Sequence, residues 1–147
     1  MDKGFRRKTN RMQTYDYASN GIYFLTLCAR DRLCLFANTQ TMAISEIGEI
    51  VIDALSQIDN IYTGVHIEKY IIMPNHVHIL MRLHCSNATL STIVGQCKRY
   101  VTRRAGEPVW QKSFYDHVVR SEADYQHIWE YMENNPAKWV EDRYYTP

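Results

Sequence analysis

The segment from residue 65 to residue 83 constrains the fold of this chain more than any other part. It holds two runs rich in β-forming residues, 65–73 and 76–83, separated only by Pro74-Asn75. Proline presets φ and asparagine tolerates unusual backbone angles, so this dipeptide predicts a tight turn between two antiparallel strands. Side chains alternate between the faces of a strand. The alternation sends one set of apolar side chains from the second run into a core: Val77, Ile79, Met81 and Leu83.

The same alternation places His76 and His78 together on the opposite face of the second strand. Two neighbouring imidazoles on one face of a sheet can form half of a metal site. Two tolerated surface histidines would show the same pattern. A metal site therefore requires a second element that covers this face.

The remaining periodicity predicts a β-α-β-β-α-β order followed by one further helix. Strands are expected at 21–29 and 114–119, and a helix at 46–58 begins after Ser45. A second helix, capped by Asn87 or Thr89, ends at Gly106-Glu107-Pro108, and a third begins at Ser121 and ends at Asn135-Pro136. This order is the split βαβ, ferredoxin-like layout of an α+β protein. Two helices would then cover one face of the antiparallel sheet and leave the histidine face for the third.

Tyr131 and Asn135 lie four residues apart on this third helix, with His127 one turn earlier. If the helix lies on the open face, these side chains can reach His76 and His78. From the pattern alone, a half-buried packing tyrosine and a helix-terminating asparagine are the favoured explanation of these residues.

Charge is distributed unevenly along the 147 residues, although the net charge is only +1. Two basic clusters stand out, and each fits either phosphate contacts or an ordinary solvated surface. Their members are Lys3, Arg6, Arg7, Lys8 and Arg11 in an irregular arm over residues 1–20, and Lys98, Arg99, Arg103 and Arg104 on the second helix. No apolar run approaches the roughly 18 residues of a membrane span, which favours a single cytoplasmic domain over residues 1–147. The four cysteines have no CxxC spacing and are expected to be reduced, mostly buried thiols.

Several motifs in order along nearly the whole chain resemble the single-tyrosine HUH transposases, most closely the REP-associated tyrosine transposases and related insertion-sequence enzymes. These motifs are Tyr15-Asp16-Tyr17, the His-hydrophobe-His strand within 73–78, Trp110-Gln111, residues 114–120, and the Tyr-x-x-x-Asn-Pro context within 131–139.

The resemblance implies roles for individual residues. His76 and His78 match the metal-binding pair, Tyr131 matches the nucleophile, and Asn135 stands where relatives place a polar side chain that can complete the metal site. Tyr125 and Tyr115 are rival nucleophiles by residue type alone. The implied cofactor is a divalent ion, Mg²⁺ or Mn²⁺, and histidine ligation favours Mn²⁺.

The implied reaction is nicking and rejoining of single-stranded, hairpin-associated DNA through a covalent 5′-phosphotyrosine. The basic residues would contact the DNA backbone. The short connection after Arg120 favours a monomer over a dimer that exchanges its tyrosine helix. Three alternatives stay open: a nuclease that uses water with the histidine pair, a DNA-binding module without catalysis, and a structural protein.

Overall fold

The computed structural model describes residues 20–142. In order, the elements are β1 (Gly21–Cys28), η1 (Arg30–Arg32), α1 (Glu46–Ile61), β2 (Val65–Met73), β3 (His76–Leu83), α2 (Leu90–Ala105), β4 (Tyr115–Val119), α3 (Glu122–Asn134) and η2 (Pro136–Glu141). None of these helices is long and apolar enough to cross a membrane.

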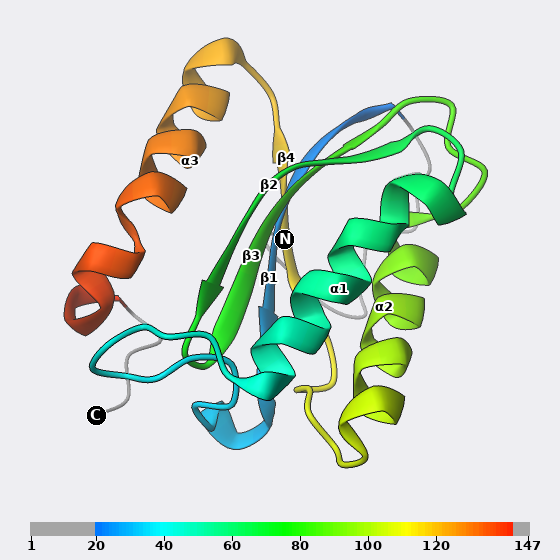
Figure 1. Cartoon of the computed structure of the whole chain (residues 1–147). Helices are drawn as coiled ribbons and strands as arrows, with labels where there is room; N and C mark the ends of the chain where they lie inside the picture. The colour runs from blue at the N-terminus through cyan, green and yellow to red at the C-terminus, as the bar shows by residue number, and fades with distance from the viewer. Residues whose placement is uncertain (1–19, 143–147) are drawn as a thin grey trace.

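The four strands form one antiparallel sheet in the order β2-β3-β1-β4. Helices α1 and α2 pack side by side on one face, and α3 lies on the other (Figure 1). This is the expected ferredoxin-like α+β layout with an added C-terminal helix.

The predicted helix ends are confirmed by their hydrogen bonds. The side chains of Ser45, Thr89 and Ser121 each accept a hydrogen bond from the backbone N–H three residues later. These bonds satisfy donors that a helix N-terminus leaves exposed. Helix α2 ends at Gly106, whose φ of 75° is the left-handed conformation that glycine adopts without strain.

The main core lies between the sheet and the pair α1/α2. It includes the four inward side chains of β3 that the alternation predicted, Val77, Ile79, Met81 and Leu83. A second, smaller cluster on the opposite face joins Leu80 of β3 to Ile128 and Met132 of α3. Helix α3, the tyrosine helix that carries Tyr131, therefore packs on its own small apolar cluster, separate from the main core.

All four cysteines lie within residues 20–142, and only Cys28 and Cys97 are buried. Cys85 is exposed and Cys34 is intermediate, so the expectation of mostly buried thiols is wrong for half of them. Cys85 lies in the connection after β3, where the apolar alternation of the strand has already ended.

Candidate functional site

The β2–β3 hairpin brings His76 and His78 together at one end of the open face. Both side chains are buried, and their ring centroids lie 4.7 Å apart. The two residues share a face because they are two apart on β3, as the alternation predicted.

A hydrogen bond at Nδ1 orients each imidazole. His76 Nδ1 lies 2.8 Å from Asn75 Oδ1, and His78 Nδ1 lies 3.0 Å from the hydroxyl of Thr26. Thr26 stands directly opposite His78 in the β1–β3 ladder, so strand register supplies this partner. When Nδ1 donates a proton to such an oxygen, Nε2 carries the lone pair that can bind a metal.

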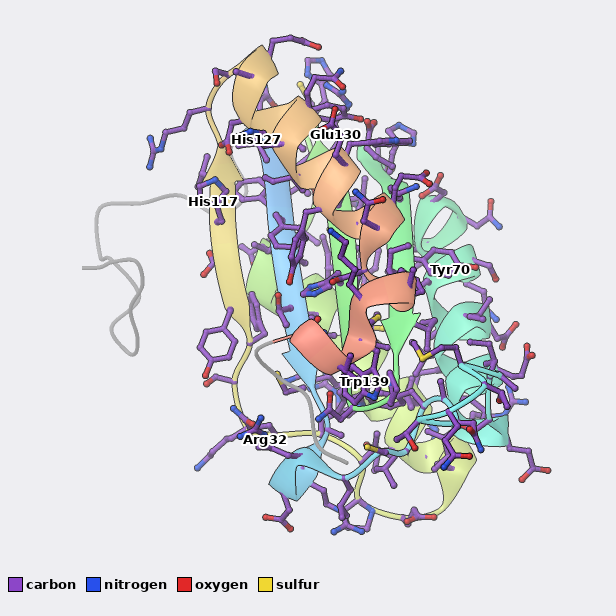
Figure 2. The ribbon with its side chains drawn as sticks, turned by 90° about the vertical axis from the view of Figure 1, so that its left-hand side faces the viewer. Arg32, Tyr70, His117, His127, Glu130 and Trp139 are labelled. Carbon is purple, nitrogen blue, oxygen red and sulfur yellow. The ribbon has the colours of Figure 1, made fainter. Side chains whose placement is uncertain are left out.

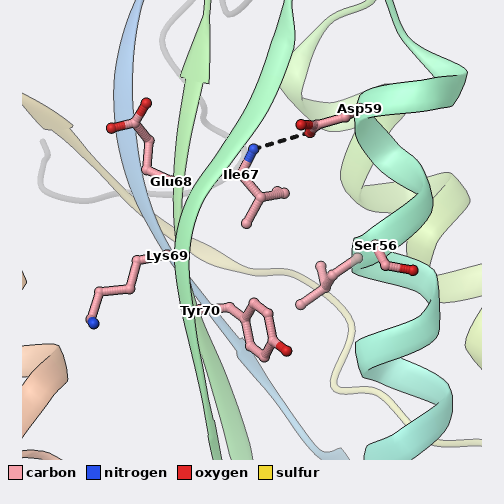
Figure 3. A pocket seen from close by; sticks show the side chains of 7 residues that line it. Ser56, Asp59, Ile67, Glu68, Lys69 and Tyr70 are labelled. Carbon is pink, nitrogen blue, oxygen red and sulfur yellow. Dashed lines mark hydrogen bonds between the residues drawn. The ribbon is translucent and has the colours of Figure 1, made fainter.

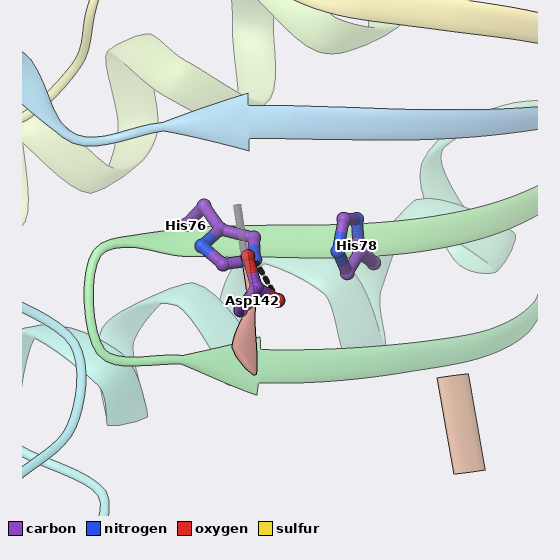
Figure 4. A group of neighbouring side chains, drawn as sticks. All are labelled: His76, His78 and Asp142. Atoms are coloured by element: carbon purple, nitrogen blue, oxygen red, sulfur yellow. Dashed lines mark ion pairs between the residues drawn. The ribbon is translucent and has the colours of Figure 1, made fainter. Parts of the chain in front are cut away.

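Asp142 adds a carboxylate to the histidine pair (Figure 4). Its Oδ2 lies 3.6 Å from His76 Nε2, and both side chains are fully buried. One possible ligand atom from each of His76, His78 and Asp142 lies within 4.8 Å of the others. Ligands about 2.0–2.2 Å from one ion lie at most about 4.4 Å apart, so a small side-chain adjustment would let the three share a cation. Two imidazoles and one carboxylate are a donor set suited to Mn²⁺ and other transition ions.

Sequence reasoning missed Asp142. It follows η2, eleven residues after Tyr131, and no periodicity connects it to β3. Asp142 reaches the histidines only because η2 runs back along the sheet and contacts β2. Trp139 of η2 packs near His76, with ring centroids 6.3 Å apart.

Helix α3 brings Tyr131 to the same place. Its ring centroid lies 5.5 Å from that of His78 and 6.2 Å from that of Phe24, which itself stacks on His78 at 5.0 Å. Tyr131 is 43% exposed, so the residue is open to solvent. A phenol beside two buried imidazoles and open to solvent has the placement of a nucleophile next to a metal site.

Asn135 ends α3, one turn after Tyr131, and is buried. Its Nδ2 has no hydrogen-bond partner among residues 20–142. Buried polar atoms are rarely left unsatisfied, so this N–H donor is available to an acceptor such as a phosphate oxygen, whereas a cation would bind Oδ1 of the same amide. Its role as a metal ligand stays a prediction.

The two rival tyrosines occupy different surroundings. Burial, with a hydrogen bond to Glu68, raises the pKa of Tyr125 to about 12, which makes it a poorer nucleophile. Tyr115 stands opposite Thr26 on the edge strand β4 and is exposed. His117 and His127 lie near the first turns of α3, at the far end from Trp139 (Figure 2).

The predicted DNA-contact residues of α2 are separated from this site. Lys98, Arg99, Arg103 and Arg104 are on α2, on the opposite side of the sheet from α3 (Figure 1). Lys98 donates to the backbone carbonyls of Gln111 and Ser113, and Arg104 pairs with Asp53. Arg99 and Arg103 are exposed. The other cluster, Lys3, Arg6, Arg7, Lys8 and Arg11, and the Tyr15-Asp16-Tyr17 motif lie outside the described residues.

No family model matches the chain. An uncharacterised protein of Haemophilus influenzae is 31% identical over 95% of this chain and 93% of its own length. The REP-associated tyrosine transposase of Escherichia coli is 26% identical over 84% of this chain and 72% of its own length. This chain belongs to the REP-associated tyrosine transposase family.

A solved structure supports the same fold. The structure described as a REP-associated tyrosine transposase bound to a REP hairpin superposes with a TM-score of 0.69 at 23% identity, covering 87% of this chain and 73% of that one. A likeness at this identity establishes the fold, and the roles of individual residues rest on the geometry above.

Proposed function

We propose that this transposase cuts and rejoins single-stranded DNA beside a hairpin, with Tyr131 as the nucleophile and a divalent cation held by His76, His78 and Asp142. The observation that carries the proposal is the packing of the exposed Tyr131 ring 5.5 Å from buried His78, beside the three possible ligands. Asn135 is the further polar group at the end of the tyrosine helix. The hairpin substrate is proposed by family membership and by the hairpin-bound structure that shares this fold.

In the proposed step, the Tyr131 oxygen attacks a backbone phosphorus and a new O–P bond forms. The bond from phosphorus to the 3′ oxygen breaks, the phenol proton leaves to solvent, and the departing oxygen takes up a proton. The protein then carries the 5′ phosphate, and a free 3′ hydroxyl can reverse the reaction to join DNA. One phosphodiester is exchanged for another, so no energy cofactor is needed.

Protein groups prepare this step in two ways. Asn75 and Thr26 hold the two imidazoles with Nε2 directed toward the shared site. A bound divalent cation supplies Lewis-acid stabilisation of the phosphate oxygens there. Phe24 packs against both His78 and Tyr131, which fixes their separation.

Binding of the DNA backbone is assigned to the basic clusters of the N-terminal arm and of α2. Exposed Arg99 and Arg103 are the stronger candidates on α2, because Lys98 and Arg104 already bind groups of the protein. We further propose a monomer acting in the cytoplasm, because the short connection between β4 and α3 leaves little slack for exchange of α3 between two copies.

The test uses the full chain, Mn²⁺ and an end-labelled single-stranded hairpin oligonucleotide from the flanks of the gene, separated on a denaturing gel. We expect a metal-dependent band at the combined mass of protein and DNA. Tyr131→Phe should abolish the band and leave hairpin binding nearly unchanged, because it removes only a hydroxyl. Cleaved DNA without a covalent band would instead indicate a water-using nuclease, and a gel shift without cleavage would indicate a binding module.

A further inference from the structure

Strand β2 departs from regular alternation at Glu68. Ile67 pairs with Met81 and Lys69 with Leu80, so Glu68 is an extra residue in the ladder, a β-bulge. In a regular strand, Glu68 and Lys69 would point to opposite faces. Here both side chains leave on the side away from α1, whereas Ile67 and Tyr70 point toward it (Figure 3).

The side chains of Glu68 and Lys69 both contact α3. The hydroxyl of Tyr125 donates to Glu68 at 2.7 Å, and Glu68 is held in place by Arg82 at 2.8 Å. The Lys69 ammonium lies 2.5 Å from a Glu133 carboxylate oxygen and 4.3 Å from the centre of the Trp129 ring. The Lys69 side chain is only 15% exposed, which strengthens these charge interactions relative to those of a fully solvated lysine.

The three α3 residues contacted in this way, Tyr125, Trp129 and Glu133, are spaced by four. They form one stripe along the helix. Tyr131 lies between Trp129 and Glu133 in sequence and points instead toward His78. The bulge therefore contacts residues of α3 that precede Tyr131 in sequence and one that follows it.

The apolar contacts under α3 are non-directional, and most of the hydrophobic residues that make them are only partly buried. Leu80, Ile128 and Met132 are the buried members of that cluster, and apolar burial by itself tolerates sliding. A shift of one residue along a helix turns it by about 100° and moves it about 1.5 Å, which would carry Tyr131 away from His78. Directional polar contacts are what select one rotation and one register.

We propose that the Glu68–Lys69 bulge is the docking point that sets the rotation and register of the tyrosine helix, and that Lys69 and Glu133 are positioning residues for attack by Tyr131. The proposal rests on the proposed function for its catalytic consequence. The docking itself is a property of the folded chain and can be measured without DNA.

A direct contact between Lys69 and a DNA phosphate is the competing explanation for any loss of activity on mutation of Lys69. Glu133→Lys separates the two. It adds positive charge, so a DNA contact at Lys69 predicts tighter binding and undiminished attack. Docking predicts slower attack, because two ammonium groups would now repel each other across the β2–α3 contact.

The experiment measures single-turnover covalent-adduct formation with the hairpin oligonucleotide and Mn²⁺, together with hairpin affinity. We expect Lys69→Glu and Glu133→Lys each to lower the rate about ten- to hundredfold, as expected when a reacting group is displaced by about 1 Å. Affinity for the hairpin should weaken by no more than about threefold in Glu133→Lys. The double variant Lys69→Glu/Glu133→Lys, which restores the ion pair with reversed sign, should recover most of the rate.

The matched control is His66→Gln. His66 is exposed on the same strand, and its ion-pair partner is Asp59 of α1, not a residue of α3. This variant should react at the wild-type rate. The proposal would be overturned if Glu133→Lys formed the adduct at the wild-type rate. It would also be overturned if the double variant reacted no faster than the slower single variant.

Amide hydrogen exchange gives a readout that does not require catalysis. Exchange in residues 122–134 should rise in each single variant and return toward wild type in the double variant, with β1 and β3 unchanged. Unchanged exchange in α3 would overturn the docking proposal. If wild-type protein forms no adduct but α3 exchange follows this pattern, the proposed reaction fails and the docking stands.

Discussion

Thr26→Val removes one hydroxyl beside the proposed metal site and keeps the shape of the side chain. Thr26 and His78 are both buried, and the hydroxyl lies 3.0 Å from His78 Nδ1. To bind a metal through Nε2, His78 must carry its proton on Nδ1, and that proton needs an acceptor. In the variant the metal-bound form leaves a buried N–H unsatisfied, whereas the metal-free ring can move its proton to Nε2.

The penalty therefore falls mainly on the metal-bound state. An unsatisfied buried donor costs about 1–3 kcal/mol, and about 1.4 kcal/mol corresponds to a tenfold change in an equilibrium constant. We expect the Kd for Mn²⁺ to rise about ten- to hundredfold, the range typical for loss of a hydrogen bond to a metal-ligating histidine. The Phe24 ring still stacks on His78, so its orientation is largely retained.

Isothermal titration with Mn²⁺ measures this change directly, and adduct formation should recover at saturating Mn²⁺. Thr26→Ser keeps the hydroxyl and is the matched control, with a Kd within about threefold of wild type. Mn²⁺ affinity in Thr26→Val equal to that of wild type would refute the role assigned to this hydrogen bond. Equal losses in the valine and serine variants would refute it as well.

Three further predictions concern the packing of α3 on the sheet and the DNA contacts. A hydrogen bond from Arg82 holds the pKa of the Glu68 carboxyl below its usual 4.5. The stability that ionised Glu68 contributes is therefore present above pH 4.5 and is lost as the pH falls through the lowered pKa. The Tm of Glu68→Gln should fall less steeply in acid than the Tm of the wild-type protein. Met132→Ala should cost about 2–4 kcal/mol of α3 docking, because Met132 is fully buried in the small cluster, and should raise amide exchange in α3 while the main sheet stays protected. Charge reversal at Arg99 and Arg103 should weaken hairpin binding and lower its salt slope by about one per lost phosphate contact, and an unchanged slope would move the DNA path away from α2.

Much of this fold could be predicted because its signals are local. The alternation in β3, the Pro74-Asn75 turn and the capping residues Ser45 and Ser121 depend on neighbours in sequence, and the structure confirms each. The face of the sheet on which His76 and His78 lie followed from the same alternation.

The parts that sequence did not reveal depend on tertiary contacts. Asp142 reaches the histidines only because η2 turns back along the sheet, and the bulge at Glu68 appears only when β2 is paired with β3. Thr26 could have been identified as the partner of His78 only from the β1–β3 register. Local pattern thus located the histidines, the family resemblance singled out the tyrosine, and tertiary structure supplied the groups that orient and complete the site.

Peptide mapping of the covalent adduct tests the central claim most directly. Trypsin cleaves after Arg120 and Lys138, so residues 121–138 form one peptide that carries both Tyr125 and Tyr131. Tyr115 falls in a separate peptide, 113–120. After nuclease trimming of the DNA, fragmentation by tandem mass spectrometry should place the phosphonucleotide on Tyr131 alone. A modification on Tyr125 or Tyr115 would contradict the account, because the site would then be built around a different nucleophile.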